Sequence, residues 1–197
     1  MKKVDIEPIR QEDFLPASVI LSRAFSIELN NLAVFRGERN IERRQQPLFS
    51  YMLKKFPGTI LVAKQESNII GVACMVKWPQ CQMTQLAMLQ YILGMFPVLR
   101  GGLLREFRLR RVWAKYDPNE MHWHIGPIGI APELQRRGFG SELIASSLEI
   151  VDGEHEPAYL ETDRMDNVRF YQHFGFSIVA EQKINGVRNW FMWRVAR

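Results

Sequence analysis

The chain has 197 residues, of which 47% are hydrophobic and 24% are charged, and these values indicate a soluble globular domain with a sizeable core. Its 26 basic and 21 acidic residues give a net charge of +5, which favours anionic ligands but is too small to indicate nucleic-acid binding by itself. The two cysteines, Cys74 and Cys81, indicate neither a disulfide framework nor a cysteine-rich metal site. The charged N-terminal residues are unlike a signal peptide, and the apolar stretch from Leu86 to Leu99 is too short and interrupted to span a bilayer, so we expect a cytoplasmic protein.

The first third of the chain reads as strands and helices in alternation. Strand patterns cover residues 4–9, 59–64 and 69–78, and the turn at Glu66-Ser67-Asn68 predicts that the last two form a hairpin. Helical patterns cover residues 13–25 and 39–55, the second ending before Pro57-Gly58.

Residues 79–118 differ from the rest because they are helical, apolar and then strongly basic. We expect two helices, broken at Pro97 and Gly101-Gly102 and inserted into the sheet domain. The apolar side chains that could cover an acceptor site are Leu86, Leu89, Leu93 and Phe96. The basic run comprises Arg100, Arg105, Arg108, Arg110, Arg111 and Lys115. It is either a solvated helix face or a surface for RNA, a membrane or an acidic partner.

The second half returns to strand character over residues 121–130, where Gly126-Pro127 predicts an edge or a bulge. A helix over 140–151, a strand over 158–161 and a short helix over 167–174 follow. Strands over 177–181 and 189–195, joined at Asn185-Gly186, complete the chain. No repeat or low-complexity linker is present, so residues 1–197 are expected to form a single domain.

The loop Gln135-Arg136-Arg137-Gly138-Phe139-Gly140-Ser141 lies between a predicted strand and a predicted helix. Its two glycines allow close approach of a ligand to the backbone, and the helix N-terminus offers unsatisfied N–H donors to an anion such as a pyrophosphate. The alternative is a surface turn that only starts a helix. The loop matches neither the P-loop nor the dinucleotide-binding fingerprint.

A second motif follows about 30 residues later, Asn167-Val168-Arg169-Phe170-Tyr171, with Gly175-Phe176 behind it. Together with the glycine loop, it resembles the GNAT superfamily of acyl-CoA N-acyltransferases. Three stretches, His122-Trp123-His124-Ile125, Tyr159-Leu160-Glu161-Thr162 and Asn167 to Tyr171, are most similar to the puromycin N-acetyltransferase-type branch. The close resemblance covers the chain from His122 to the C-terminus.

The resemblance implies an α/β fold, with a six- to seven-stranded, mostly antiparallel mixed sheet and helices on both faces. Acetyl-CoA, as co-substrate, would lie where the strands at 121–130 and 158–161 separate. Ile128, Gly129 and Ile130 would hydrogen-bond the pantetheine, and Gln135, Arg136, Arg137, Gly138, Phe139, Gly140 and Ser141 would hold the pyrophosphate. Asn167 would bind the pantetheine arm, with Phe170 and His173 lining the same path.

The expected reaction needs a neutral amine. An alkylamine of pKa near 10.4 is mostly protonated at pH 7, which costs about 4.6 kcal/mol, so a general base is useful. The candidates are Glu161, His122 and His124, and the resemblance favours Glu161. The two histidines lie on one face of a strand, where they are either core residues or half of a metal site. Because His155 and His173 offer no convincing third ligand, we expect no metal.

Tyr171 is the expected acid at the departing thiolate, or alternatively an aromatic residue packed on the sheet. Because a thiol is more acidic than a phenol, a hydrogen bond to the thiolate is as plausible as proton transfer.

These features predict an N-acetyltransferase acting on a small-molecule amine. The alternatives are a nucleic-acid-directed enzyme that acetylates aminoacyl-tRNA and a CoA-binding protein without catalysis. The aromatic run Trp190-Phe191-Met192-Trp193 also suggests a homodimer formed through the last strand.

Overall fold

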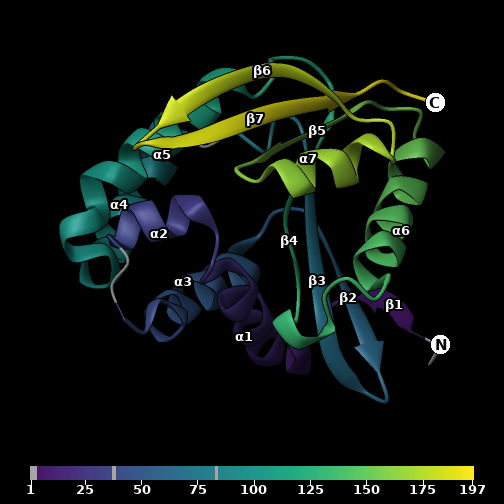
Figure 1. Cartoon of the computed structure of the whole chain (residues 1–197), viewed down its shortest axis with the longest axis horizontal. Coiled ribbons are helices and arrows are strands. Elements are labelled where there is room, and N and C mark those ends of the chain that lie inside the picture. The colour runs from purple at the N-terminus through teal and green to yellow at the C-terminus, as the bar shows by residue number, and fades with distance from the viewer. Residues whose placement is uncertain (1–3, 37–38, 83) are drawn as a thin grey trace.

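A computed structural model describes residues 4–36, 39–82 and 84–197, which form a mixed, mostly antiparallel sheet of seven strands (Figure 1). The strand order is β1-β2-β3-β4-β5-β7-β6, and only the β4–β5 pair is parallel. The strands are β1 (Asp5–Pro8), β2 (Thr59–Gln65), β3 (Asn68–Lys77), β4 (Trp123–Ile130), β5 (Ala158–Thr162), β6 (Ser177–Ile184) and β7 (Val187–Arg194). The predicted strands and the hairpin of β2 and β3 are therefore confirmed.

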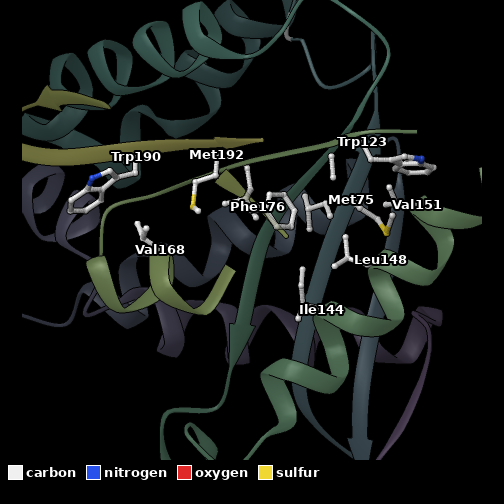
Figure 2. Packing of buried hydrophobic residues seen from close by; sticks show 12 residues of the cluster. Met75, Trp123, Ile144, Leu148, Val151, Val168, Phe176, Trp190 and Met192 are labelled. Atoms are coloured by element: carbon white, nitrogen blue, oxygen red, sulfur yellow. The ribbon is translucent and has the colours of Figure 1, made fainter. Parts of the chain in front are cut away.

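Helices cover both faces of the sheet, as expected. The helices α1 (Phe14–Phe25) and α3 (Ile41–Lys55) pack apolar residues against β2 and β3 on one face. On the other face lie α6 (Phe139–Gly153) and α7 (Met165–Gln172). Figure 2 shows the core beneath α6 and α7, where Ile144 and Leu148 of α6 and Val168 of α7 meet Met75 and Met192 of the sheet. This packing fixes α6, which begins in the glycine loop, and α7, which contains the motif from Asn167 to Tyr171.

The insertion consists of α4 (Gln85–Leu99), a 3-10 turn over Arg100–Gly102 and α5 (Leu103–Tyr116). The break at the two glycines is confirmed, but the break predicted at Pro97 is wrong, because α4 continues to Leu99. A proline so near the C-terminal end removes one backbone hydrogen bond, and the last turn still forms.

The apolar face predicted for the insertion is only partly described. The side chains of Leu86 and Phe96, and also that of Arg100, lie outside the part of the chain whose side chains are described. Leu89 and Leu93 are more than half exposed.

One helix, α2 (Leu29–Phe35), was not predicted. Together α2, α4 and α5 cover the C-terminal part of the sheet, where Leu99 and Leu109 pack against Tyr159 and Phe191.

The C-terminal strand does not carry the exposed aromatic surface on which the homodimer hypothesis depended. Trp190, Phe191 and Met192 are buried within one chain, and Trp193 is half-buried, because helices cover both sides of β7. Among the described helices, none combines the length and apolar character needed to cross a membrane.

Candidate active site

The two central strands separate along their length. β4 pairs with β5 only at Trp123 and His124, so the part of β4 that follows has a free edge toward β5. Opposite Cys74 of β3, β4 carries the two residues Gly126 and Pro127, because Ala73 pairs with Ile128 and Met75 pairs with Ile125. The predicted bulge is therefore present, and it precedes Ile128, Gly129 and Ile130.

The glycine loop joins the end of β4 to the start of α6. Gly138 has a φ of 92°, a left-handed conformation that suits glycine, and it is the N-cap residue of α6. The first N–H groups of α6 have no partner within the helix and point toward its N-terminus, which carries a partial positive charge. Gln135 donates a hydrogen bond to the carbonyl oxygen of Ile130 at 3.1 Å, so the loop is held against β4.

The predicted loop residues differ in their exposure. Gln135, Arg136, Arg137, Gly138 and Ser141 are exposed, and Gly140 is half-buried. Phe139 is a buried core residue, so its side chain serves packing and only its backbone faces the loop.

The short helix α7 places Asn167, Phe170 and Tyr171 beside the separated strands. Asn167 donates a hydrogen bond to the hydroxyl of Thr162 at the end of β5, at 3.2 Å. Phe170 packs edge-on against Tyr171 with ring centroids 5.2 Å apart. His173 is exposed at the end of the helix, where Nδ1 donates to the carbonyl oxygen of Arg169, so the structure does not bring it into this group.

The Tyr171 phenol lies in an acidic environment. Burial raises the pKa of Tyr171, and the negative charges of Glu28 and Glu161 raise it further. The side chain is therefore a neutral hydrogen-bond donor at physiological pH. The charge of Glu161 on β5 thus acts on Tyr171 of α7, although the two residues come from different elements.

A cluster of ionisable groups lies at the start of β4 and the end of β5. His124 Nδ1 lies 2.7 Å from Asp117 Oδ2, and His124 Nε2 lies 3.1 Å from Glu161 Oε2. His122 is fully buried, and its Nε2 lies 3.3 Å from Asp117 Oδ1. Cys81 Sγ lies 3.7 Å from Asp117 Oδ1 and 3.8 Å from His122 Nε2.

The charges of this cluster are coupled. Although burial opposes it, hydrogen bonding to Asp117 raises the pKa of His122 to about 9. Burial also disfavours the charged form of His124. The charge of Glu161 and the hydrogen bond with Asp117 outweigh this effect and raise the pKa of His124. The same contacts lower the pKa of Asp117 against the effect of burial. In the metal-free chain, the cluster therefore holds an ionised carboxylate between two histidines that retain their protons.

Two buried polar atoms at this site have no hydrogen-bond partner among the described residues, Glu161 Oε2 and the Tyr159 hydroxyl. The contact from His124 Nε2 to Glu161 Oε2 is short, but its angle does not make a hydrogen bond. Leaving such an oxygen unsatisfied costs about 1–3 kcal/mol, and more for a charged group. Glu161 Oε2 therefore has an ion-pair contact with His124 but lacks a well-aligned N–H donor.

The insertion contributes a second polar group on this face. Arg110 Nε donates to Glu106 at 2.8 Å, and Tyr91 donates to the same carboxylate oxygen at 2.7 Å. The Arg110 guanidinium stacks on Trp113, and the negative charge of Glu161 contributes to raising its pKa. Arg105 is also engaged, donating to the carbonyl oxygen of Val34. Two arginines of the predicted basic run are thus occupied by contacts within the chain.

Several residues of this site were not identified from sequence. Only His155 and His173 were considered from the sequence as further ligands beside the strand histidines, whereas the structure brings Cys81 and Asp117 there. Asp117 stands five residues before His122, a spacing that could have been noticed. Cys81 gave no local signal, because the fold alone brings it to the pair. The carboxylate of Glu28, whose charge acts on Tyr171, and that of Asp163, which neighbours Glu28, were also missed.

Residues 26–176 match the family model described as "Acetyltransferase (GNAT) family". An uncharacterized N-acetyltransferase, C550.08, of Schizosaccharomyces pombe is 35% identical over 108 residues, which cover 45% of this chain and 43% of that protein. The chain thus spans less than half the length of the curated relative that it matches.

Two solved structures show the same architecture. A histone acetyltransferase HPA2 and related acetyltransferase from Corynebacterium glutamicum has a TM-score of 0.76 at 18% identity, over 98% of this chain and 97% of that chain. A GNAT family acetyltransferase from Brucella melitensis, in complex with acetyl-CoA, has a TM-score of 0.56 at 15% identity, over 99% of this chain and 89% of that chain. At these identities, the likeness establishes the fold and confirms the predicted one.

Proposed function

Because the chain belongs to the GNAT acetyltransferase family, we propose that it transfers the acetyl group of acetyl-CoA to a primary amine of a small molecule, by direct attack in a ternary complex. The observation that carries this proposal is the buried Glu161 oxygen without a hydrogen-bond partner, in the same site as the neutral phenol of Tyr171.

Three features support acetyl-CoA as the acyl donor. The free edge of β4 at Ile128, Gly129 and Ile130 offers backbone groups to the amides of pantetheine. The exposed loop from Gln135 to Gly138, with the N-terminus of α6, offers N–H groups and two arginines to the pyrophosphate. Asn167 and Phe170 of α7 flank the path between them.

Glu161 is placed to receive a proton from the acceptor. An ammonium group donates to Glu161 Oε2, and transfer of one proton leaves the nitrogen lone pair free to attack the thioester carbonyl. His124 Nε2 lies 3.1 Å from the same Glu161 oxygen, and His124 is itself fixed by Asp117. His124 is thus a positioning residue in this proposal.

Tyr171 completes the reaction at the sulfur. Its raised pKa makes full proton transfer to a thiolate more unfavourable than it would be for an ordinary phenol. A hydrogen bond from the Tyr171 hydroxyl to the developing thiolate is the role that its environment supports, because that bond strengthens as negative charge forms on sulfur.

A small acceptor fits the site better than RNA. The insertion directs Arg105 and Arg110 into contacts within the chain, which leaves Arg108, Arg111 and Lys115 exposed. The resemblance to the puromycin N-acetyltransferase-type branch, which rests on sequence motifs, also supports a small amine-bearing compound.

The test is a panel of primary amines offered with acetyl-CoA, with release of free thiol and the mass of the acetylated product as readouts. We expect at least one amine to give equal amounts of thiol and amide. Absence of turnover with every amine, while CoA still binds in a calorimetric titration, would instead indicate a CoA-binding protein without catalysis. Turnover with aminoacyl-tRNA alone would favour the nucleic-acid-directed alternative.

A further inference from the structure

The geometry points to a metal site at the base of the insertion, with Zn²⁺ as the ion and with Cys81, Asp117, His122 and His124 as its ligands. Each residue offers one ligand atom, and these atoms all lie within 4.8 Å of one another. The site lies beside Glu161 but uses none of its atoms.

The spacing of the ligand atoms matches a tetrahedral site. With Zn–S near 2.3 Å and Zn–N or Zn–O near 2.0–2.1 Å, a tetrahedron has edges of about 3.6 Å to sulfur and about 3.3 Å between the lighter atoms. The observed edges are 3.7 Å and 3.8 Å from Cys81 Sγ, and 3.3 Å from His122 Nε2 to Asp117 Oδ1. Three ligand atoms therefore already form one face of such a tetrahedron. His124 Nδ1 lies 2.7 Å from the other oxygen of Asp117, which is closer than a tetrahedral edge, so the histidine shifts when it completes the site.

The hydrogen bonds of His122 support a ligand role. Its Nδ1 lies 2.7 Å from the carbonyl oxygen of Glu120, which can only accept, so Nδ1 carries a proton. In the neutral imidazole, the lone pair of Nε2 then faces the carboxylate of Asp117 and the sulfur of Cys81. Converging lone pairs in a buried place need a positive charge between them, and without a metal this is the proton on Nε2 of His122. A metal can take the place of that proton, and a backbone carbonyl on the other ring nitrogen is the usual support of a metal-ligating histidine.

The other histidine has a similar arrangement. His124 Nδ1 faces Asp117, and its Nε2 lies 3.1 Å from the Glu161 carboxylate. A metal-bound Nδ1 leaves the N–H on Nε2, next to that carboxylate. The ring of Tyr159, whose buried hydroxyl has no hydrogen-bond partner among the described residues, packs edge-on against His122 and His124 and so borders the same site.

The ligand types select the metal. One thiolate, two imidazoles and one carboxylate oxygen suit Zn²⁺, whereas Ca²⁺ and Mg²⁺ require oxygen ligands. Because all four tetrahedral positions come from the protein, the expected role is structural.

The position of the ligands explains what the ion would hold. Cys81 lies in the turn after β3, Asp117 caps the C-terminus of α5, and His122 directly precedes β4. A metal here links both ends of the insertion to each other and to the sheet. It therefore ties the helices that cover the acceptor side to the strand that carries His124, and its binding energy contributes to folding.

The experiment uses the full chain, stripped of metal with a chelator and titrated with Co²⁺ in the absence of acetyl-CoA. We expect one equivalent to bind with the intense visible bands of tetrahedral Co²⁺ and a near-ultraviolet thiolate-to-cobalt band, and Zn²⁺ to displace it. Cys81→Ala should abolish the thiolate band and weaken binding at least about tenfold, whereas the matched variant Cys74→Ala, which alters the buried cysteine outside the cluster, should retain both.

Weak octahedral Co²⁺ binding, no binding, or a thiolate band that survives in Cys81→Ala would overturn the proposal. If Cys81→Ala does not fold, X-ray absorption on the zinc-loaded wild-type protein tests the proposal instead. Absence of a Zn–S distance near 2.3 Å would show that Cys81 does not bind the metal and would overturn the proposal. No readout depends on acetyl transfer, so the outcome is separate from that of the proposed function.

Discussion

The two sides of the site are built in different ways. The side assigned to acetyl-CoA consists of two short stretches, the end of β4 with the glycine loop and the helix α7, and each carries its own sequence motif. The acceptor side gathers the insertion, the start of β4 and the end of β5 from separate parts of the chain. In the proposed function, the common co-substrate is thus bound by local motifs, whereas the acceptor is selected by contacts that only the fold creates.

This contrast explains what the sequence could predict. The strands, the bulge at Gly126-Pro127 and the helices after the glycine loop follow from periodicity and turn residues, and the structure confirms them. The cluster around Asp117 could not be derived, because Cys81 and His122 are 41 positions apart and meet only when the insertion folds back on the sheet. The exposed aromatic strand was predicted wrongly for the same reason, since helices far away in sequence cover β7.

The largest expected effect is on the acceptor side. Glu161→Gln keeps the shape of the side chain but removes the carboxylate, so we expect kcat/KM for an accepted amine to fall by about 100-fold or more. Steady-state thiol release measures this. Glu149→Gln, on an exposed position of α6, is the matched control. A loss below about threefold would exclude Glu161 as the base.

Tyr171→Phe should have the next largest effect, because it removes the donor to the departing thiolate while keeping the aromatic packing with Phe170. We expect kcat to decrease about tenfold or more, with CoA affinity retained. Tyr51→Phe, at a half-exposed tyrosine, is the control. Unchanged kcat under conditions where chemistry limits the rate would remove Tyr171 from the mechanism.

Gly138→Ala should weaken the acetyl-CoA side alone. An alanine at a φ of 92° is strained by about 1–2 kcal/mol, so the loop must either keep that strain or shift away from its binding conformation. We expect CoA affinity to fall by about fivefold to thirtyfold. Gly153→Ala, at the open end of α6, tests whether loss of any glycine has this effect.

The smallest expected effect is on stability, at the junction of the two sides. Burial, together with the neighbouring carboxyl of Asp163, raises the pKa of Glu28 to about 8, against the opposing charge of Arg164. Between the unfolded value near 4.5 and about 8, the folded protein binds a proton that the unfolded chain has lost. Stability should therefore decrease as the pH rises through this window. Above about pH 6.5, His122 and His124 add to the decrease, because their pKa values are raised in the folded protein.

Urea unfolding at several pH values measures this decrease, which we expect to be a few kcal/mol at most. Glu28→Gln should flatten the part of the decrease between about pH 4.5 and 6.5, below the range in which the two histidines lose their protons, because the amide does not titrate. Glu149→Gln should leave that part unchanged. It is assigned to Glu28, which Asp163, Arg164 and Tyr171 face. A wild-type curve that rises across this window would show that Glu28 is ionised in the folded protein.

The separation of the two sides is tested most directly by calorimetric titration of CoA into Glu161→Gln and Gly138→Ala, side by side. We predict that Glu161→Gln binds CoA within about twofold of the wild type, whereas Gly138→Ala binds it about fivefold to thirtyfold more weakly. Equal loss of CoA affinity in both variants would contradict it, because Glu161 would then belong to the acetyl-CoA side.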